Sequence, residues 1–131
     1  MMMKSKIFTF LAALFLICLV FSHAAPIPGD SAVVILSNLD GKITFTQVDD
    51  VNVKIVGKIN KGITEDKLEN YFVQLGIPKV PFSEFGIKKI EVPGTAKWEL
   101  TSPGQVNQLI NSDLLIYHKN EVIDTGTMEI P

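Results

Sequence analysis

Apolar and polar positions between residues 32 and 59 follow the pattern of β-strands. Residues 32–37 contain a β-branched run, Asn38-Leu39-Asp40-Gly41 has the composition of a turn, and residues 43–47 alternate apolar with polar side chains. After two aspartates the alternation resumes in residues 51–59, with valine and isoleucine on one face and asparagine and lysine on the other. We therefore expect a hairpin followed by a third, half-buried strand.

Residues 64–77 carry conflicting signals. Thr64 is a good helix cap, acidic residues follow it, four apolar residues lie at helical spacing and Gly76 comes just after them. These local signals predict a helix. The segment Tyr71–Leu75 would also serve as a strand, so strand is the alternative.

The rest of the chain reads as short strands separated by turns. Residues 87–92 alternate weakly, Pro93-Gly94 suits a turn, and residues 96–100 around Trp98 look extended. Ser102-Pro103-Gly104 is expected to break the chain. The last expected strands, 114–117 and 125–130, form a closing pair joined through Lys119-Asn120, and the tally is seven or eight.

Many short strands with at most one helix predict an all-β fold, an antiparallel Greek-key sandwich or barrel. The alternative is an α+β ferredoxin-like sheet with helices. That alternative requires residues 64–77 and 105–110 both to be helices.

The first 24 residues have the features of a secretory signal peptide. Lys4 and Lys6 precede an apolar run over residues 7–21, which is too short to cross a bilayer comfortably, and Ala24 offers a cleavage site. A retained membrane anchor is the alternative. We predict a signal peptide at 1–24, a flexible tail at 25–30, one domain at 31–131, secretion to the extracellular space and no membrane span after cleavage.

Composition restricts the chemistry of the mature protein. The single cysteine, Cys18, lies in the predicted signal, so neither a disulfide nor a thiol nucleophile is expected. Every cationic side chain is lysine, and without arginine the chain lacks the planar group that reads guanine and phosphate bidentately. Lysines are outnumbered by acidic residues. We therefore expect no nucleic-acid partner.

Catalytic and metal-binding motifs are scarce. His118 is the only histidine that signal cleavage leaves, and no phosphate-binding loop or nucleophile elbow is present. Asp49-Asp50, Asp113 and Asp124 lack the spacing of a calcium loop, so turn and edge solvation explains them better. Five aromatic residues that could line a ligand pocket are expected to lie in the core instead. They are Tyr71, Phe72, Phe82, Phe85 and Trp98.

Residues 31–64 resemble the opening strands of the copper/zinc superoxide dismutase family. The matching stretches are Ala32–Leu36, Gly41–Gln47 and Val53–Thr64, with a looser match around Leu114–Lys119. The resemblance implies an eight-stranded Greek-key barrel with immunoglobulin-like topology, a copper and zinc centre, and a strand ending in a metal-binding histidine, which corresponds to His118.

The chain departs from this family in its chemistry. Where the family has a His-Val-His element, this sequence has Tyr71-Phe72-Val73, and the family's disulfide and guiding arginine are missing. A redox copper site needs several imidazoles. We therefore expect a scaffold without metal or cofactor and without dismutase activity. The alternative is a residual metalloprotein in which His118 holds copper or zinc.

Residues 53–76 also resemble the first strand and helix of an RNA recognition motif, notably over Thr64–Phe72. Such domains stack bases on aromatic residues of central strands, and the matching strand position here carries Lys54. Secretion and the absence of arginine argue further against this reading.

The function expected from the sequence is a secreted, non-enzymatic binding or interaction module. Its partner is an extracellular protein, a cell-wall component or a small ligand. Because an isolated histidine near a strand end is usually a surface or hydrogen-bonded residue, we expect that His118→Ala changes stability little.

Overall fold

The computed structural model describes residues 27–76 and 78–131, which form ten β-strands and three short 3₁₀ helices. The strands are β1 (Ser31–Leu36), β2 (Gly41–Gln47), β3 (Asn52–Ile59), β4 (Tyr71–Leu75), β5 (Lys79–Pro81), β6 (Ile90–Glu91), β7 (Gly94–Thr95), β8 (Trp98–Pro103), β9 (Asp113–His118) and β10 (Glu121–Thr127). The helices are η1 (Leu68–Asn70), η2 (Phe82–Phe85) and η3 (Val106–Gln108). The predicted signal peptide, with Cys18, lies outside the described residues.

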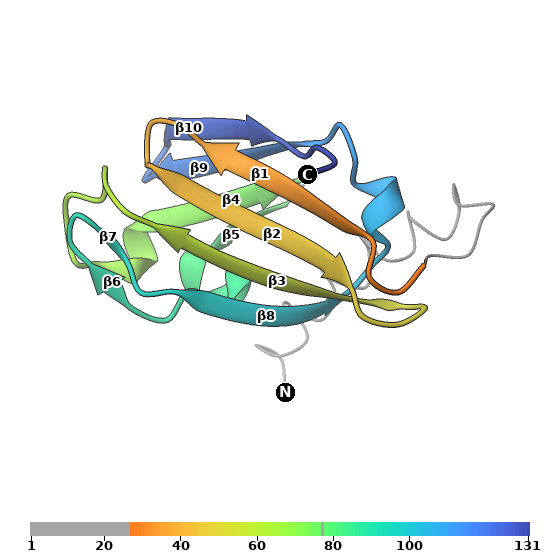
Figure 1. Cartoon of the computed structure of the whole chain (residues 1–131). Helices are drawn as coiled ribbons and strands as arrows, with labels where there is room; N and C mark the ends of the chain where they lie inside the picture. The colour runs from red at the N-terminus through yellow and green to blue at the C-terminus, as the bar shows by residue number, and fades with distance from the viewer. Residues whose placement is uncertain (1–26, 77) are drawn as a thin grey trace.

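Eight strands make two four-stranded antiparallel sheets that pack face to face (Figure 1). One sheet has the order β1-β2-β3-β8 and the other β10-β9-β4-β5, while β6 and β7 form a separate small ribbon. The chain crosses between the sheets after β3, after β5 and after β8. Because β8 returns to pair with β3 and β9 with β4, the connections are of the Greek-key type. The predicted all-β antiparallel sandwich is confirmed.

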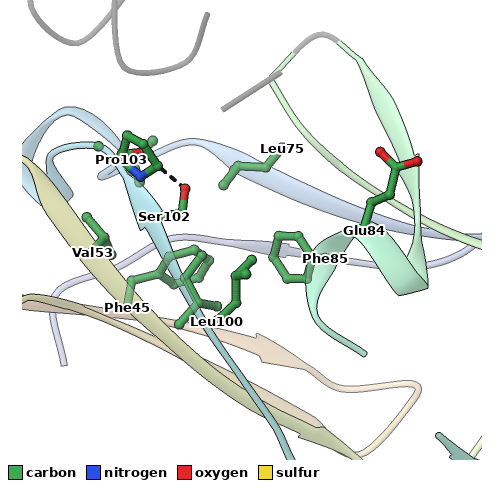
Figure 2. A pocket seen from close by; sticks show the side chains of 11 residues that line it. Phe45, Val53, Leu75, Glu84, Phe85, Leu100, Ser102 and Pro103 are labelled. Carbon is green, nitrogen blue, oxygen red and sulfur yellow. Dashed lines mark hydrogen bonds between the residues drawn. The ribbon is translucent and has the colours of Figure 1, made fainter. Parts of the chain in front are cut away.

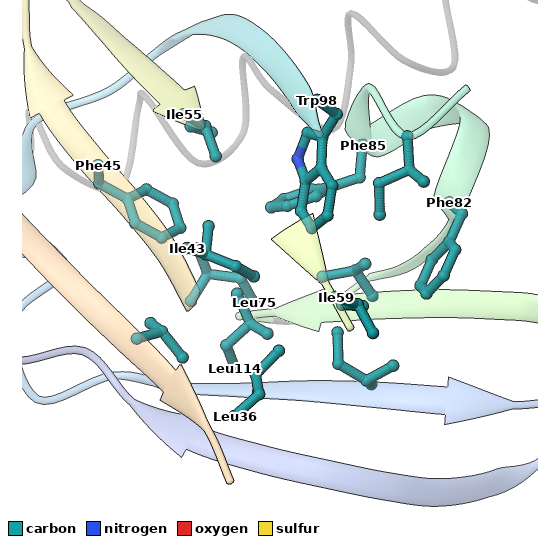
Figure 3. Packing of buried hydrophobic residues seen from close by; sticks show 14 of the residues in the cluster. Leu36, Ile43, Phe45, Ile55, Ile59, Leu75, Phe82, Phe85, Trp98 and Leu114 are labelled. Atoms are coloured by element: carbon teal, nitrogen blue, oxygen red, sulfur yellow. The ribbon is translucent and has the colours of Figure 1, made fainter. Parts of the chain in front are cut away.

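The first three strands follow the predicted alternation. In β2 the side chains of Ile43 and Phe45 are fully buried, and in β3 that of Ile55 is 5% exposed. Phe45 lies opposite Ile55 in the β2–β3 register. The two apolar phases therefore face the same layer between the sheets, where they join a single core (Figure 3).

One side of the sandwich is closed. Val33 on β1 and Glu129 after β10 exchange two backbone hydrogen bonds of 2.8 and 2.9 Å, so the two sheets meet along this side. Gly126 on β10 lies so close to β1 that an added Cβ would be 2.5 Å from the carbonyl oxygen of Ile35. Glycine is required here by close approach of two backbones. On the opposite side β8 and β5 are sheet edges, and η2 follows β5.

The helix predicted over residues 64–77 is wrong, and the strand alternative is right. A single 3₁₀ turn, η1, leads into β4, and Ile77 lies outside the described residues. Tyr71, Val73 and Leu75 are buried at a spacing of two, and β4 hydrogen-bonds to strands on both sides. Pairing with two neighbours outweighs local helix propensity, which is a weak preference.

Residues 105–110 also contain only one 3₁₀ turn, η3, so the α+β alternative is wrong for the described residues. The break predicted at Ser102-Pro103-Gly104 falls later than expected, because β8 continues through Pro103. No helix among the described residues is long and apolar enough to cross a bilayer.

The predicted tail at 25–30 is anchored at its end. Gly29 donates a 2.8 Å hydrogen bond to the carbonyl of Gln47, and the N–H of Gln47 donates to Asp30. The same hollow is lined by Gly29 and Asp30 near the start of the described chain and by Ile130 and Pro131 at its end. The two ends therefore lie at the same end of the sandwich.

Candidate functional site

His118, the only candidate ligand from the sequence, lies at the end of β9 opposite Tyr71, the first residue of β4. The two rings are stacked, with centroids 4.5 Å apart and planes 10° apart. Directly opposed residues in an antiparallel pair bring their side chains close on one face of the sheet. The ring contact thus follows from the β4–β9 register.

Tyr71 connects this pair to the core and to the loop after β3. Its side chain is fully buried and also stacks on Phe82, with centroids 5.4 Å apart. Its hydroxyl accepts hydrogen bonds from the backbone N–H groups of Thr64 at 3.0 Å and Glu65 at 3.3 Å. A buried phenol usually finds such partners. The loop is therefore fastened to β4 at this point.

Glu65 completes the arrangement. Its Oε2 lies 2.5 Å from Nε2 of His118 and accepts a 3.0 Å hydrogen bond from the amide of Asn70. The bond from His118, then that from Asn70, lowers the pKa of the Glu65 carboxyl below its ordinary value, and the charge of Lys119 adds to this effect. The ionised carboxylate is thus the form that this site favours.

The copper and zinc implied by the sequence resemblance need a set of donors that this site does not supply. Nε2 of His118 is engaged by Glu65, and the Tyr71 hydroxyl is engaged by two backbone N–H groups. Across residues 27–76 and 78–131, no group of three or more His, Cys, Asp or Glu side chains gathers as metal ligands would. One imidazole is too few for a site that cycles copper. The residues present do not fit either metal.

The aspartates singled out in the sequence lie apart and serve local structure. Asp49 accepts hydrogen bonds from the N–H groups of Val51 and Asn52 and from the Asn52 amide, and these bonds, led by that amide, lower the pKa of its carboxyl. Asp113 accepts a bond from the Thr127 hydroxyl. Asp124 is buried and accepts the N–H of Leu39 at 3.0 Å. These contacts indicate turn and strand support.

Four of the five singled-out aromatic residues, Tyr71, Phe82, Phe85 and Trp98, are buried in the core as expected. Phe72 is not. It lies on the outer face of the second sheet opposite Tyr117, and the ammonium of Lys79 sits 4.9 Å from its ring centroid and 4.4 Å from that of Tyr117.

A small apolar cavity lies between the sheets at the open side (Figure 2). The side chains of Phe45, Leu75, Phe85 and Leu100 converge on it, and Ser102 and Pro103 of β8 stand beside them. Its volume is about 20 Å³. This space is close to the smallest that holds one water, and its lining is mostly apolar. The cavity is suited to apolar groups.

Sequence reasoning missed the role of Glu65, which it placed in the first turn of a helix. Its partner His118 is 53 residues away, and no local spacing links them. It also missed Gln47, which sits in the apolar phase of β2 and is 1% exposed. The amide of Gln47 donates to the carbonyls of Asp49, Asn52 and Gly104, and its oxygen accepts the N–H of Val106. Its position in the alternation was the available signal.

The fold defines an antiparallel β-sandwich with Greek-key connections, closed along one side by the contact of β1 with the segment after β10, with β8 and β5 as sheet edges along the other. Among solved structures, it is similar to the crystal structure of the clock protein EA4, with a TM-score of 0.54 and 15% sequence identity. The match covers 84% of this chain and 100% of that chain. At this identity the likeness shows the fold alone. No family model matches the chain, and neither does any curated protein sequence.

Proposed function

We propose that the mature chain is a secreted, non-enzymatic binding module built on a scaffold like that of copper/zinc superoxide dismutase. The main support is the Tyr71–His118–Glu65 arrangement. The resemblance puts metal ligands at Tyr71 and His118, and here a stacked pair of rings and a carboxylate bond occupy those positions. Both polar groups that a metal would use are already satisfied by the protein.

The same arrangement favours a structural role over chemistry. A catalytic base must reach a substrate, whereas the imidazole of His118 lies flat on Tyr71 and is hydrogen-bonded to Glu65. The described residues place no cysteine, second histidine or metal cluster near it. Binding through the surface is the activity that such a domain retains.

Superoxide decay and metal content test this proposal. Purified mature protein and its His118→Ala variant are assayed side by side, with and without added copper, and dialysed samples are analysed for copper and zinc. We expect decay at the spontaneous rate in every sample and metal far below one equivalent per chain. Wild-type dismutation, or a tightly held metal ion that His118→Ala abolishes, would instead establish the residual metalloprotein. A pull-down from the extracellular fraction then identifies the partner.

A further inference from the structure

The edge strand β8 has backbone groups that face away from its sheet. Gly104 donates its N–H to the carbonyl of Val51, just before β3. The even-numbered residues of β8 therefore direct their backbone N–H and C=O groups towards β3. In an antiparallel pair alternate residues point in opposite directions, which directs the N–H and C=O groups of Glu99 and Thr101 to the open side. Within the part of the chain that the structure describes, no strand pairs with this side of β8. An unpaired edge is a template for another strand.

Two hollows lie along this edge, one on each side of Gly86. The apolar cavity is lined by residues 100 and 102–104 of the β8 segment together with Glu84 and Phe85. The second hollow, about 160 Å³, is lined by residues 96–99 together with Gly86, Lys88 and Lys89. Between them Gly86 lies close to β8, because a Cβ on Gly86 would be 3.0 Å from the Cβ of Leu100 and 3.5 Å from the carbonyl oxygen of Glu99. The edge therefore has the apolar cavity at one end, Gly86 close to its middle and the second hollow at the other end.

The second hollow is basic. Three of its lining residues are Lys88, Lys89 and Lys97, and its one acid, Glu99, lies 3.6 Å from Lys54 on the neighbouring strand. Lys89 pairs with Glu91 at 3.6 Å. Among the described residues no carboxylate lies within salt-bridge distance of Lys88 or Lys97. A carboxylate brought to this hollow would be attracted by two lysines that lack partners of their own.

We propose that β8 accepts an extended peptide segment of a partner protein as an additional antiparallel strand. This inference rests on the proposed binding function and names its surface. The peptide runs opposite to β8, so it meets the apolar cavity first and the basic hollow about four residues, roughly 13 Å, later. Main-chain hydrogen bonds to Glu99 and Thr101 provide affinity, and the two hollows provide selectivity.

The hollows define the side chains that fit. Residues two apart in a strand point to the same face, so positions i, i+2 and i+4 of the peptide face the cavity, Gly86 and the basic hollow. A small apolar residue such as alanine fits the first position, because the space is near 20 Å³, about enough for one methyl group. A small residue fits the second position, because Gly86 lies close to β8 there. An acidic residue fits the third, beside Lys88 and Lys97.

A displayed library of random seven-residue peptides, selected on the mature wild-type protein, tests this surface. We expect enrichment of peptides with a small apolar residue followed four positions later by aspartate or glutamate. The enriched consensus is synthesised with a fluorescent label. It should bind Thr101→Pro at least about tenfold more weakly, because proline removes an outward N–H and is tolerated at a sheet edge. Thr101→Val, which keeps that N–H, should bind as wild type does.

Charge-reversal variants and sedimentation complete the test of the β8 surface. The paired substitution Lys88→Glu with Lys97→Glu should weaken the same peptide, whereas Lys42→Glu, on β2, should not. Thermal unfolding of every variant checks that it is folded. Failure to enrich any peptide, or equal binding to wild type and Thr101→Pro, overturns the β8 surface without touching the proposed function, which the dismutation and metal assays decide. A mature protein that sediments as a dimer, and as a monomer after Thr101→Pro, would show that the edge is occupied by a second copy instead.

Discussion

At the scale of single residues, the contacts of His118 change one expectation drawn from the sequence. Its ring is stacked on Tyr71 and its side chain is 24% exposed, so truncation removes a partly covered ring pair rather than a free surface group. We predict that His118→Ala lowers the free energy of unfolding by about 0.5–1.5 kcal/mol through the ring pair alone. His118→Phe keeps the stack and should recover that part. Urea unfolding measures both, and equal stability of all three proteins would contradict the stacking role.

The carboxylate of Glu65 makes stability depend on pH. Its pKa is lowered in the folded protein, so the unfolded chain binds its proton more tightly, and the stabilisation is full above about pH 4.5 and is lost as pH falls through the folded value. The pKa of Asp49 is also lowered, so Asp49 makes its own contribution to the pH dependence of stability. We predict that the difference in unfolding free energy between wild type and Glu65→Gln narrows as the pH falls from about 5 to about 3. A difference that is constant with pH would exclude an ionised Glu65 as the stabilising form.

Substitutions of Phe45 and Ile55 test which side chains of β2 and β3 point into the core. Both are buried and face each other across the strand pair, so Phe45→Ala or Ile55→Ala should cost about 2–5 kcal/mol. Lys54→Ala should cost less than about 1 kcal/mol, because its partner Glu99 is 3.6 Å away and both side chains are well exposed. Denaturant unfolding of the three variants gives the comparison. Similar losses in all three would show that the strand phase is wrong.

At the scale of elements, the closure between β10 and β1 depends on a missing side chain. A Cβ at Gly126 would meet the Ile35 carbonyl oxygen at 2.5 Å and the Val34 side chain at 2.7 Å. We predict that Gly126→Ala lowers the thermal unfolding midpoint, because two backbones must separate to admit the methyl group. Thr125→Ala, one residue earlier on an exposed position, is the matched control. Calorimetry of both variants decides whether this closure limits stability.

The sequence predicts elements well where the signal is local. The first three strands and the turn at Lys119-Asn120 follow from alternation and turn chemistry, and the structure has them close to the expected residues. β4 was hidden because Tyr71–Leu75 satisfies helical spacing as well as alternation, and its pairing with β9 involves residues more than 35 positions away. The site was hidden for the same reason. His118 could be singled out by elimination, but its bond to Glu65 depends on the pairing of β9 with β4 and on the loop that Tyr71 holds.

At the scale of the whole molecule, export should leave a protein without a thiol. We predict that the secreted form begins at Ala25 and that its intact mass does not change on reduction, since Cys18 is removed with the signal peptide. Mass spectrometry of the protein from culture medium checks both statements. A secreted form whose mass includes Cys18 would place the cleavage site elsewhere and restore a reactive sulfur to the mature chain.

Because the two ends of the described chain line one hollow, the order of the strands along the chain is open to rearrangement. Joining Pro131 to Ile27 by a short linker and opening the chain in the turn at Lys119-Asn120 gives a circular permutant with every sheet pairing retained. β10 then precedes β1, and their closure becomes a contact between neighbours in sequence, while β9 and β10 become the most distant pair. Folding rates depend on how far apart contacting residues are in sequence. Comparing the folding rates of the permutant and the natural protein would therefore reveal whether the β10–β1 contact or the β9–β10 pairing forms first.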